Sequence, residues 1–171
     1  MLKNVQKRVL FEMLSNSRRS DRELAKALKI SQPTVTRVRR WLEKNGFILQ
    51  YTLIPDFAKI GFELVVFTFF KVLVDVPGEG RDHIMQNVMN SLANTPNGIA
   101  VLHGEGMGCD GVLVSYHENF SDFATFIREL KMNNGSIGVV GSFIAAPGGQ
   151  EGLTAVTFKH LKEYMDETVK Q

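Results

Sequence analysis

The sequence predicts an α+β chain with an N-terminal winged helix-turn-helix unit and a C-terminal ferredoxin-like βαββαβ domain. Two observations support this expectation. Apolar residues recur at helical spacing before residue 46, whereas segments rich in Val and Phe alternate with helical ones after residue 61. The charge divides at the same place. Residues 1–60 hold 13 Lys and Arg against 5 Asp and Glu, a net +8, and residues 61–171 hold 7 against 13, a net −6.

The first two helices are expected over residues 3–14 and 21–29. In the first, the apolar stripe consists of Val5, Val9, Leu10, Met13 and Leu14. Ser20 and Glu23 form a capping box, in which each side chain can accept a hydrogen bond from the backbone N–H of the other residue. The second helix is then expected to bury Leu24, Ala25 and Leu28.

The third helix is expected to start after Ser31, a good N-cap, and to end before Gly46. Pro33 suits the first turn because a backbone N–H there has no partner within the helix. At 100° per residue, one face carries Val35, Val38 and Leu42, and the opposite face carries Gln32, Pro33, Thr36, Arg37, Arg40 and Lys44. The next stretch, "FILQYTLIPD", alternates apolar and polar residues, which predicts a short β-element as the wing.

The second half of the chain predicts a βαββαβ order. The expected elements are a strand over 62–75, a helix over 80–94, strands over 98–106 and 111–119, a helix over 120–132 and a strand over 136–148. The glycine-rich stretch "GEGMGCDG" joins the two middle strands. In such a unit two helices cover one face of the sheet and leave the other face apolar. Burial of that face against a second copy of the chain predicts a two-fold homodimer.

These elements divide the chain into four parts: an N-terminal unit over residues 1–54, a hinge over 55–61, a βαββαβ domain over 62–147 and a C-terminal helix over 148–171. The last part is amphipathic, with apolar Val156, Leu161, Tyr164, Met165 and Val169. It is expected either to pack on its own domain or to extend dimers into tetramers or octamers.

The outward face of the third helix has the chemistry of a helix that enters the major groove of double-stranded DNA. Gln and Thr side chains can reach base edges, and Arg can form paired hydrogen bonds with guanine or contact phosphates. The candidate DNA-binding residues are Arg18, Arg19, Ser31, Gln32, Thr34, Thr36, Arg37, Arg39, Arg40 and Lys44. The alternative is a solvated charged helix, which leaves the capped preceding helix and the basic charge of the whole segment unexplained.

Three stretches together resemble the DNA-binding half of the Lrp/AsnC family of winged helix-turn-helix transcriptional regulators: "VLFEMLSNSRRSDRELAKALKIS", the third helix and "GFILQYTLIPDFAKIG". The βαββαβ order is similar to the second domain of that family. The resemblance implies a sequence-specific transcriptional regulator that is dimeric or larger. It also implies a small-molecule effector site, often for an amino acid, at the turn between the middle strands. The residues here that match that turn are Gly104, Glu105, Gly106 and Asp110.

The same turn allows two other interpretations. It could be a metal or thiol-sensing site, since His103, Met107, Cys109 and Asp110 lie close together in sequence, although their spacing matches no established zinc motif. It could also be a plain flexible hairpin. The histidines are expected to be structural or solvated, and neither a metal nor a cofactor is expected.

Two other functions remain open for the whole chain. One is an enzyme similar in architecture to the sirohaem decarboxylases, although the acidic part of the chain holds only Arg81 and Arg128 to meet a substrate with many carboxylates. The other is an architectural DNA-binding protein that needs no effector. The single cysteine excludes an intrachain disulfide and favours a reducing, cytoplasmic setting. The apolar stretch 64–70 is too short to span a bilayer, so no membrane partner is expected.

Overall fold

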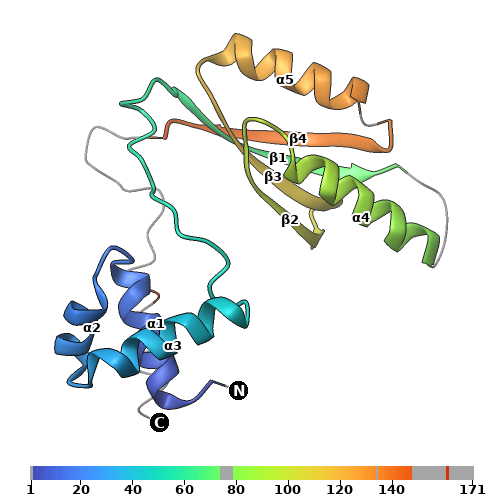
Figure 1. Cartoon of the computed structure of the whole chain (residues 1–171). Coiled ribbons are helices and arrows are strands. Elements are labelled where there is room, and N and C mark those ends of the chain that lie inside the picture. The colour runs from blue at the N-terminus through green and yellow to red at the C-terminus, as the bar shows by residue number, and fades with distance from the viewer. Residues whose placement is uncertain (1, 74–78, 134, 148–160, 162–171) are drawn as a thin grey trace. The chain divides into compact units, whose positions relative to one another are not determined.

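The computed structural model describes residues 2–73, 79–133, 135–147 and 161 of the 171-residue chain. The chain divides between Ile54 and Pro55 into two compact units, one helical and one built on a sheet (Figure 1). The predicted α+β fold class is confirmed. Among the described residues, no helix is long and apolar enough to cross a membrane. Apart from Leu161, the C-terminal helix predicted over 148–171 lies outside the described residues.

The helical unit contains α1 (Asn4–Ser15), α2 (Asp21–Leu28) and α3 (Gln32–Lys44). Its core is a single cluster of buried side chains from all three helices: Val9, Met13, Leu24, Ala25, Leu28, Val35, Val38 and Leu42. The three residues predicted for the inner face of α3 all belong to this cluster. Burial of each large side chain contributes roughly 1.5–3 kcal/mol to folding, so the core holds the helices together.

The two predicted helix starts are confirmed. The Ser20 hydroxyl accepts a hydrogen bond from the Glu23 backbone N–H at 3.3 Å, and the Glu23 carboxylate accepts one from the Ser20 N–H at 2.7 Å. At the start of α3, the Ser31 hydroxyl accepts from the backbone N–H of Thr34 at 3.4 Å. Lys29 lies between the two helices in the left-handed region at φ 54°, which turns the chain sharply from α2 into α3.

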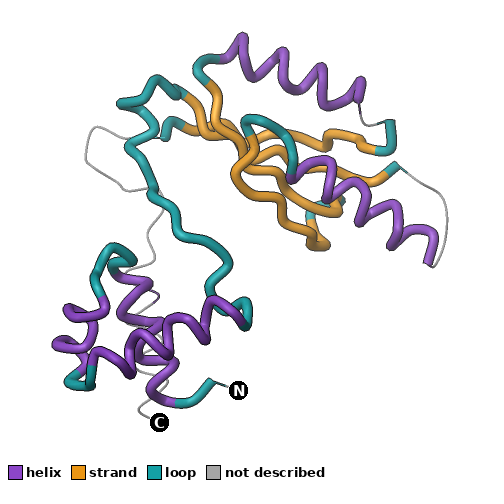
Figure 2. The backbone as a smooth tube through the Cα atoms, viewed as in Figure 1, coloured by secondary structure: helices purple, strands orange, loops and turns teal. Residues whose placement is uncertain are grey.

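The prediction of a short β-element as the wing is wrong. No strand is assigned to the described residues between α3 and residue 64, and Figure 2 draws this segment as loop. Leu49 is 91% exposed and Leu53 is 75% exposed. The pattern of alternation is present, but a strand needs a second backbone for its hydrogen bonds, and the described part of the helical unit contains no other strand.

The second unit is a four-stranded antiparallel sheet with two helices. Its elements, in chain order, are β1 (Leu64–Val72), α4 (Glu79–Ala93), β2 (Gly98–Gly106), β3 (Cys109–His117), α5 (Phe120–Asn133) and β4 (Ile137–Ala145). The strand order β2-β3-β1-β4 places the middle strands of the sheet, β3 and β1, far apart in sequence. This is the predicted βαββαβ arrangement.

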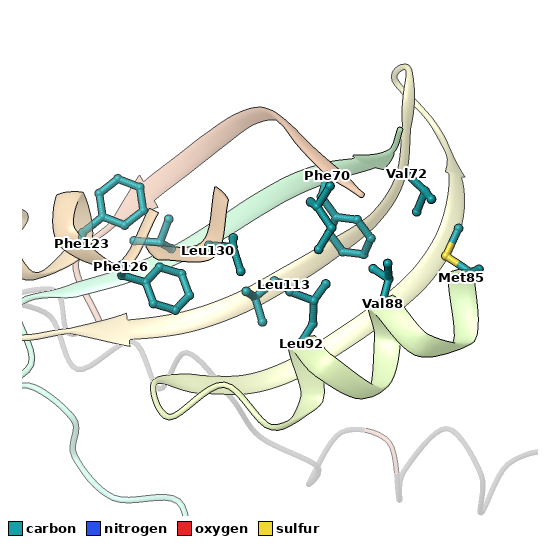
Figure 3. Packing of buried hydrophobic residues seen from close by; sticks show 11 residues of the cluster. Phe70, Val72, Met85, Val88, Leu92, Leu113, Phe123, Phe126 and Leu130 are labelled. Atoms are coloured by element: carbon teal, nitrogen blue, oxygen red, sulfur yellow. The ribbon is translucent and has the colours of Figure 1, made fainter. Parts of the chain in front are cut away.

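Both helices lie on one face of this sheet, and the main core fills the space between them and the strands (Figure 3). Its central side chains are Phe70 of β1 and Leu113 of β3, which are almost completely buried. Met85, Val88 and Leu92 project from α4, whereas Phe123, Phe126 and Leu130 project from α5. The core therefore joins strands and helices that are far apart in the sequence, from Val66 to Ile137.

The turn between the middle strands is shorter than the glycine-rich stretch suggests. β3 starts at Cys109, two residues earlier than predicted, and Gly106 pairs with Cys109 across a two-residue turn. Met107 and Gly108 both have positive φ, 51° and 72°, as a type I′ hairpin turn requires. The strand predicted over 98–106 is confirmed as β2, and the turn is shorter than predicted because Cys109 and Asp110 belong to β3.

The second face of the sheet, here called the open face, is apolar, and the described residues cover only part of it. Phe57 stacks on Tyr116 with ring centroids 3.7 Å apart, and Phe62 meets the same ring edge-on. These two aromatic residues cover one part of the open face, around Val65 and Val114. Elsewhere on it Leu102 and Phe143 are 58% and 61% exposed.

His117 is a fully buried histidine at the end of β3. Its Nδ1 lies 3.1 Å from the Asp122 carboxylate, and its Nε2 lies 2.9 Å from the Ser115 hydroxyl. Asn97 also approaches the ring, at 3.3 Å. Burial lowers the pKa of His117 below its ordinary value of 6.5, and the hydrogen bond to Asp122 only partly opposes this effect.

We expect this histidine to make the protein less stable as the pH falls. A lowered pKa means that the unfolded chain takes up a proton below about pH 6.5 before the folded chain does, so stability declines below that pH by at most about 1.4 kcal/mol per pH unit. Calorimetry of the wild type and of His117→Gln between pH 8 and pH 5 measures the effect. The wild type should lose more stability over this range, and parallel curves would contradict the assignment.

Candidate nucleic-acid interface

The outer face of α3 is exposed and basic. Gln32, Arg37, Arg40 and Lys44 are exposed, whereas the residues of the inner face are buried. Among the described residues, no ion pair joins Arg37, Arg40 or Lys44 to a carboxylate. The helix therefore presents three cations to solvent on a scaffold whose start is capped and whose inner face is packed.

This face also carries a shallow hollow of about 560 Å³, here called the α3 hollow. It is lined by Gln32, Pro33, Thr36, Arg37 and Arg40. Pro33 lies in the first turn of the helix and Thr36 one turn later, so their side chains are neighbours. A ring and a small branched side chain thus lie between a glutamine and two arginines.

Arg39, which lies next to these residues in sequence, points inward to a second helix. Its Nε lies 2.8 Å from the carboxylate of Asp21, at the start of α2. Its Nη2 donates a hydrogen bond to the backbone carbonyl of Arg19 at 2.9 Å. The Thr36 hydroxyl donates to the other oxygen of Asp21 at 2.6 Å. One carboxylate therefore connects α2 to two residues on successive turns of α3.

The other predicted DNA-binding residues fall into two groups. Arg18 is exposed and remains accessible to a ligand. Arg19 pairs with Glu12 of α1, while Ser31 and Thr34 are engaged with each other at the N-terminus of α3, their hydroxyls 2.8 Å apart. The structure thus groups Gln32, Thr36, Arg37 and Arg40 around the α3 hollow, with Lys44 further along, and uses Arg19 and Arg39 inside the unit.

Sequence reasoning missed Asp21. An acidic residue in the first turn of a helix is usually explained by its favourable interaction with the helix dipole, and nothing in the local pattern indicates another partner. Its contacts lie 15 and 18 residues further along the chain, at Thr36 and Arg39. Only the packing of α2 against α3 brings them together.

The predicted effector residues are separated by the structure. Gly104, Glu105 and Gly106 line a second hollow of about 180 Å³, here called the hairpin hollow, together with Phe69, Leu102, His103, Met107, Cys109, Gly111 and Val112. Asp110 does not line it. Its carboxylate accepts hydrogen bonds from the backbone N–H of Val72 at 2.8 Å and from Arg81 at 3.0 Å.

Of the residues considered for a metal or thiol site, His103, Met107 and Cys109 line the hairpin hollow and Asp110 does not. In the described ranges, no group of three His, Cys, Asp or Glu side chains is placed to hold a metal ion. The Cys109 thiol donates to the backbone carbonyl of Gly106 across the hairpin turn, with sulfur and oxygen 2.9 Å apart. Asp110 is held by Val72 and Arg81, as described above.

Ser115, His117 and Asp122 form a hydrogen-bonded series of the kind found in hydrolases. However, Ser115 and His117 are both 0% exposed, beneath α5. A nucleophile must reach its substrate, so these three residues connect the end of β3 to α5 and provide no open reactive site.

Known proteins similar to the N-terminal unit are DNA-binding proteins, in agreement with the exposed basic face of α3. Residues 2–48 match the family of winged helix-turn-helix DNA-binding domains. The transcriptional regulator LrpC of Bacillus subtilis is 45% identical over 53 residues, a stretch that covers 31% of this chain and 37% of LrpC. The sequence match thus spans little more than a third of that relative.

Solved structures match nearly the whole chain. The structure of B. subtilis LrpC superposes with a TM-score of 0.62 at 23% identity and covers 90% of this chain and 99% of its own. An AsnC family transcriptional regulator from Agrobacterium tumefaciens has a TM-score of 0.69 at 14% identity and covers 94% and 99%. A transcriptional regulator from Neisseria meningitidis in complex with L-Met has a TM-score of 0.70 at 17% identity and covers 94% and 99%.

The chain has the Lrp/AsnC architecture. The resemblance inferred from the sequence is confirmed in the N-terminal unit by sequence and in both units by fold. The basic face of α3 belongs to the stretch that matches the DNA-binding family, and the hairpin hollow belongs to the second unit.

Proposed function

We propose that this chain is a sequence-specific transcriptional regulator that binds double-stranded DNA through the outer face of α3. The observation that carries the proposal is the exposed row of Arg37, Arg40 and Lys44 on a capped helix, without a carboxylate partner in the described structure. The match of residues 2–48 to DNA-binding domains supports it. Cationic side chains on such a helix can contact phosphates and guanine edges in the major groove.

Arg37→Ala and Arg40→Ala should each weaken binding to a selected operator by about 1–3 kcal/mol while leaving the melting temperature unchanged. Arg39→Ala should instead lower the melting temperature, because it leaves Asp21 without its ion-pair partner. Fluorescence anisotropy at several salt concentrations, together with calorimetry, separates the two effects. Lys131→Ala, which removes an exposed cation from the second unit, is the control. Normal DNA binding by both Arg37→Ala and Arg40→Ala would show that α3 is not the reading helix.

We further propose that the chain acts as a homodimer formed through the open face of the sheet, with tetramers or octamers as larger assemblies. The exposed Leu102 and Phe143 support this, since large apolar side chains on a sheet face favour burial against a partner. A dimer places two α3 helices on one duplex, which raises the number of phosphate contacts that a small unit can make.

Phe143→Arg should therefore convert the assembly into monomers, because a charged side chain cannot be buried without a partner. Sedimentation velocity measures the result. Met132→Arg, at an exposed apolar residue of α5 on the opposite side of the sheet, is the matched control and should keep the wild-type mass. If Phe143→Arg sediments like the wild type, the open face is not the interface.

We also propose that the hairpin hollow binds a small amino-acid-like effector. Phe69, Leu102 and Met107 supply an apolar lining, and Glu105 can hold an ammonium group. The structural neighbour in complex with L-Met is consistent with such a ligand. Asp110 has no part in this proposal, since its carboxylate is engaged with Arg81 and Val72.

Calorimetric titration with L-methionine tests the effector site. The wild type should bind it, and Leu102→Trp should lose binding at least tenfold because the indole fills a hollow of about 180 Å³. Met132→Trp is the control for the added bulk. Because Leu102 also lies on the open face, sedimentation velocity must show that Leu102→Trp keeps the wild-type mass. Equal binding by the wild type and Leu102→Trp would place the ligand elsewhere.

The enzyme alternative finds less support. A sirohaem decarboxylase-like reaction would need arginines for the carboxylates of its substrate. Of the two in the acidic part of the chain, Arg81 is paired with Asp110. The effector-independent architectural protein remains distinguishable by experiment, because it would bind random DNA as tightly as a selected operator.

A further inference from the structure

The α3 hollow has an unusual composition for a surface that contacts DNA. Its rim consists of Gln32, Arg37 and Arg40, whereas Pro33 and Thr36 lie between them. A proline side chain carries no hydrogen-bonding group. The polarity of this part of the hollow is therefore decided by Thr36, which could present either its hydroxyl or its methyl group.

The hydroxyl of Thr36 is already engaged. It donates to the Asp21 carboxylate at 2.6 Å, and the carbonyl of Gln32 lies 3.2 Å away as a second acceptor. A hydroxyl has one proton, so Thr36 has none left to donate to a base, and its oxygen is left only as an acceptor. Asp21 is itself held by Arg39 at 2.8 Å, which keeps this arrangement in place.

Fixing the oxygen of Thr36 also fixes its methyl group, because both are attached to Cβ and the side chain turns about one bond. The oxygen is engaged with Asp21 of α2, so the methyl is the one branch of Thr36 that has no hydrogen-bond partner. Thr36 and Pro33 line the hollow together with two arginines, and no carboxylate lines it.

We propose that the α3 hollow is a specificity site for the C5-methyl group of a thymine in the major groove. Of the atoms that base pairs present there, only this methyl group is apolar, and contact with an apolar side chain is an established way of reading it. Arg37 and Arg40 on the rim have the charge that complements the adjacent phosphates or guanine edges. The inference rests on the proposed DNA-binding function and adds the base that Thr36 and Pro33 recognise. Asp21 is then a positioning residue, which acts through Thr36.

The test uses the full-length protein and an operator selected from a random DNA pool. Each thymine of the operator is replaced in turn by uracil, which lacks only the methyl group. One thymine in each half-site should show a loss of affinity of about fourfold on replacement, the value expected for one buried methyl group. The other thymines should show little change. If no thymine is sensitive, the inference is overturned although DNA binding stands.

Two variants link that thymine to Thr36. Thr36→Ser keeps the hydroxyl and its bond to Asp21 but removes the methyl, so it should bind the thymine and uracil operators equally. Thr36→Val keeps a methyl in the hollow and should still prefer thymine, with some loss of stability from the missing bond to Asp21. A thymine preference in Thr36→Ser equal to that of the wild type would overturn the assignment to Thr36.

The control for folding is circular dichroism of both variants, and the control for general DNA affinity is binding to random duplex, which Thr36→Ser should leave unchanged. If selection enriches no sequence at all, the proposed function fails, and the inference fails with it. That outcome is distinct from an enriched operator whose thymines are insensitive to replacement.

Discussion

The orientation of α3 in the helical unit depends on the contacts that the Asp21 carboxylate makes with Thr36 and Arg39. Hydrophobic burial holds α3 against α1 and α2, but it has no direction and would tolerate a small rotation of the helix about its axis. The contacts of Asp21 with Thr36 and Arg39, at 2.6 and 2.8 Å, lie on successive turns of α3, and the one from the Thr36 hydroxyl is a directional hydrogen bond. They hold Arg39 inside the helical unit, whereas Arg37 and Arg40 are exposed on the outer face.

The second unit depends on a different constraint, a sheet with helices on one face only. Its closed face holds the main core and also the buried group of Ser115, His117 and Asp122, which ties the last residue of β3 to α5. Within the described part of the chain, no helix covers the open face. Phe57 and Phe62 shield the part around Tyr116, and the rest exposes apolar side chains. Such a unit exposes apolar surface to water, and burial of that surface against a second copy is the physical basis of the proposed homodimer.

The positive charge of the N-terminal unit is consistent with the proposed binding to DNA. Residues 1–60 carry a net charge of +8, but not every cation among them is available to a ligand. Arg19 and Arg39 form ion pairs inside the helical unit. Of the cations that remain exposed on α3, Arg37 and Arg40 line the α3 hollow together with Pro33 and Thr36. Positive charge supplies affinity for any DNA, whereas the shape and chemistry of the hollow can distinguish one base pair from another. In the proposed regulator, one helix therefore supplies both general affinity for DNA, through its cations, and discrimination between bases, through the hollow.

The sequence by itself determined the three N-terminal helices, their caps, the faces of α3 and the βαββαβ order. These follow from periodicity and from contacts within three or four residues, such as the pair Ser20 and Glu23, which local pattern reveals directly. Tertiary structure alone decided the remaining features. It left the expected wing strand without a partner, shortened the hairpin turn to Met107 and Gly108, and turned Asp110 away from the hairpin hollow. It also brought Asp21 to Thr36 and Arg39. The hairpin turn is closed by the neighbouring residues Gly106 and Cys109. The other outcomes depend on a hydrogen-bond partner far along the chain, and a pattern within a short window contains no information about which distant group will lie there.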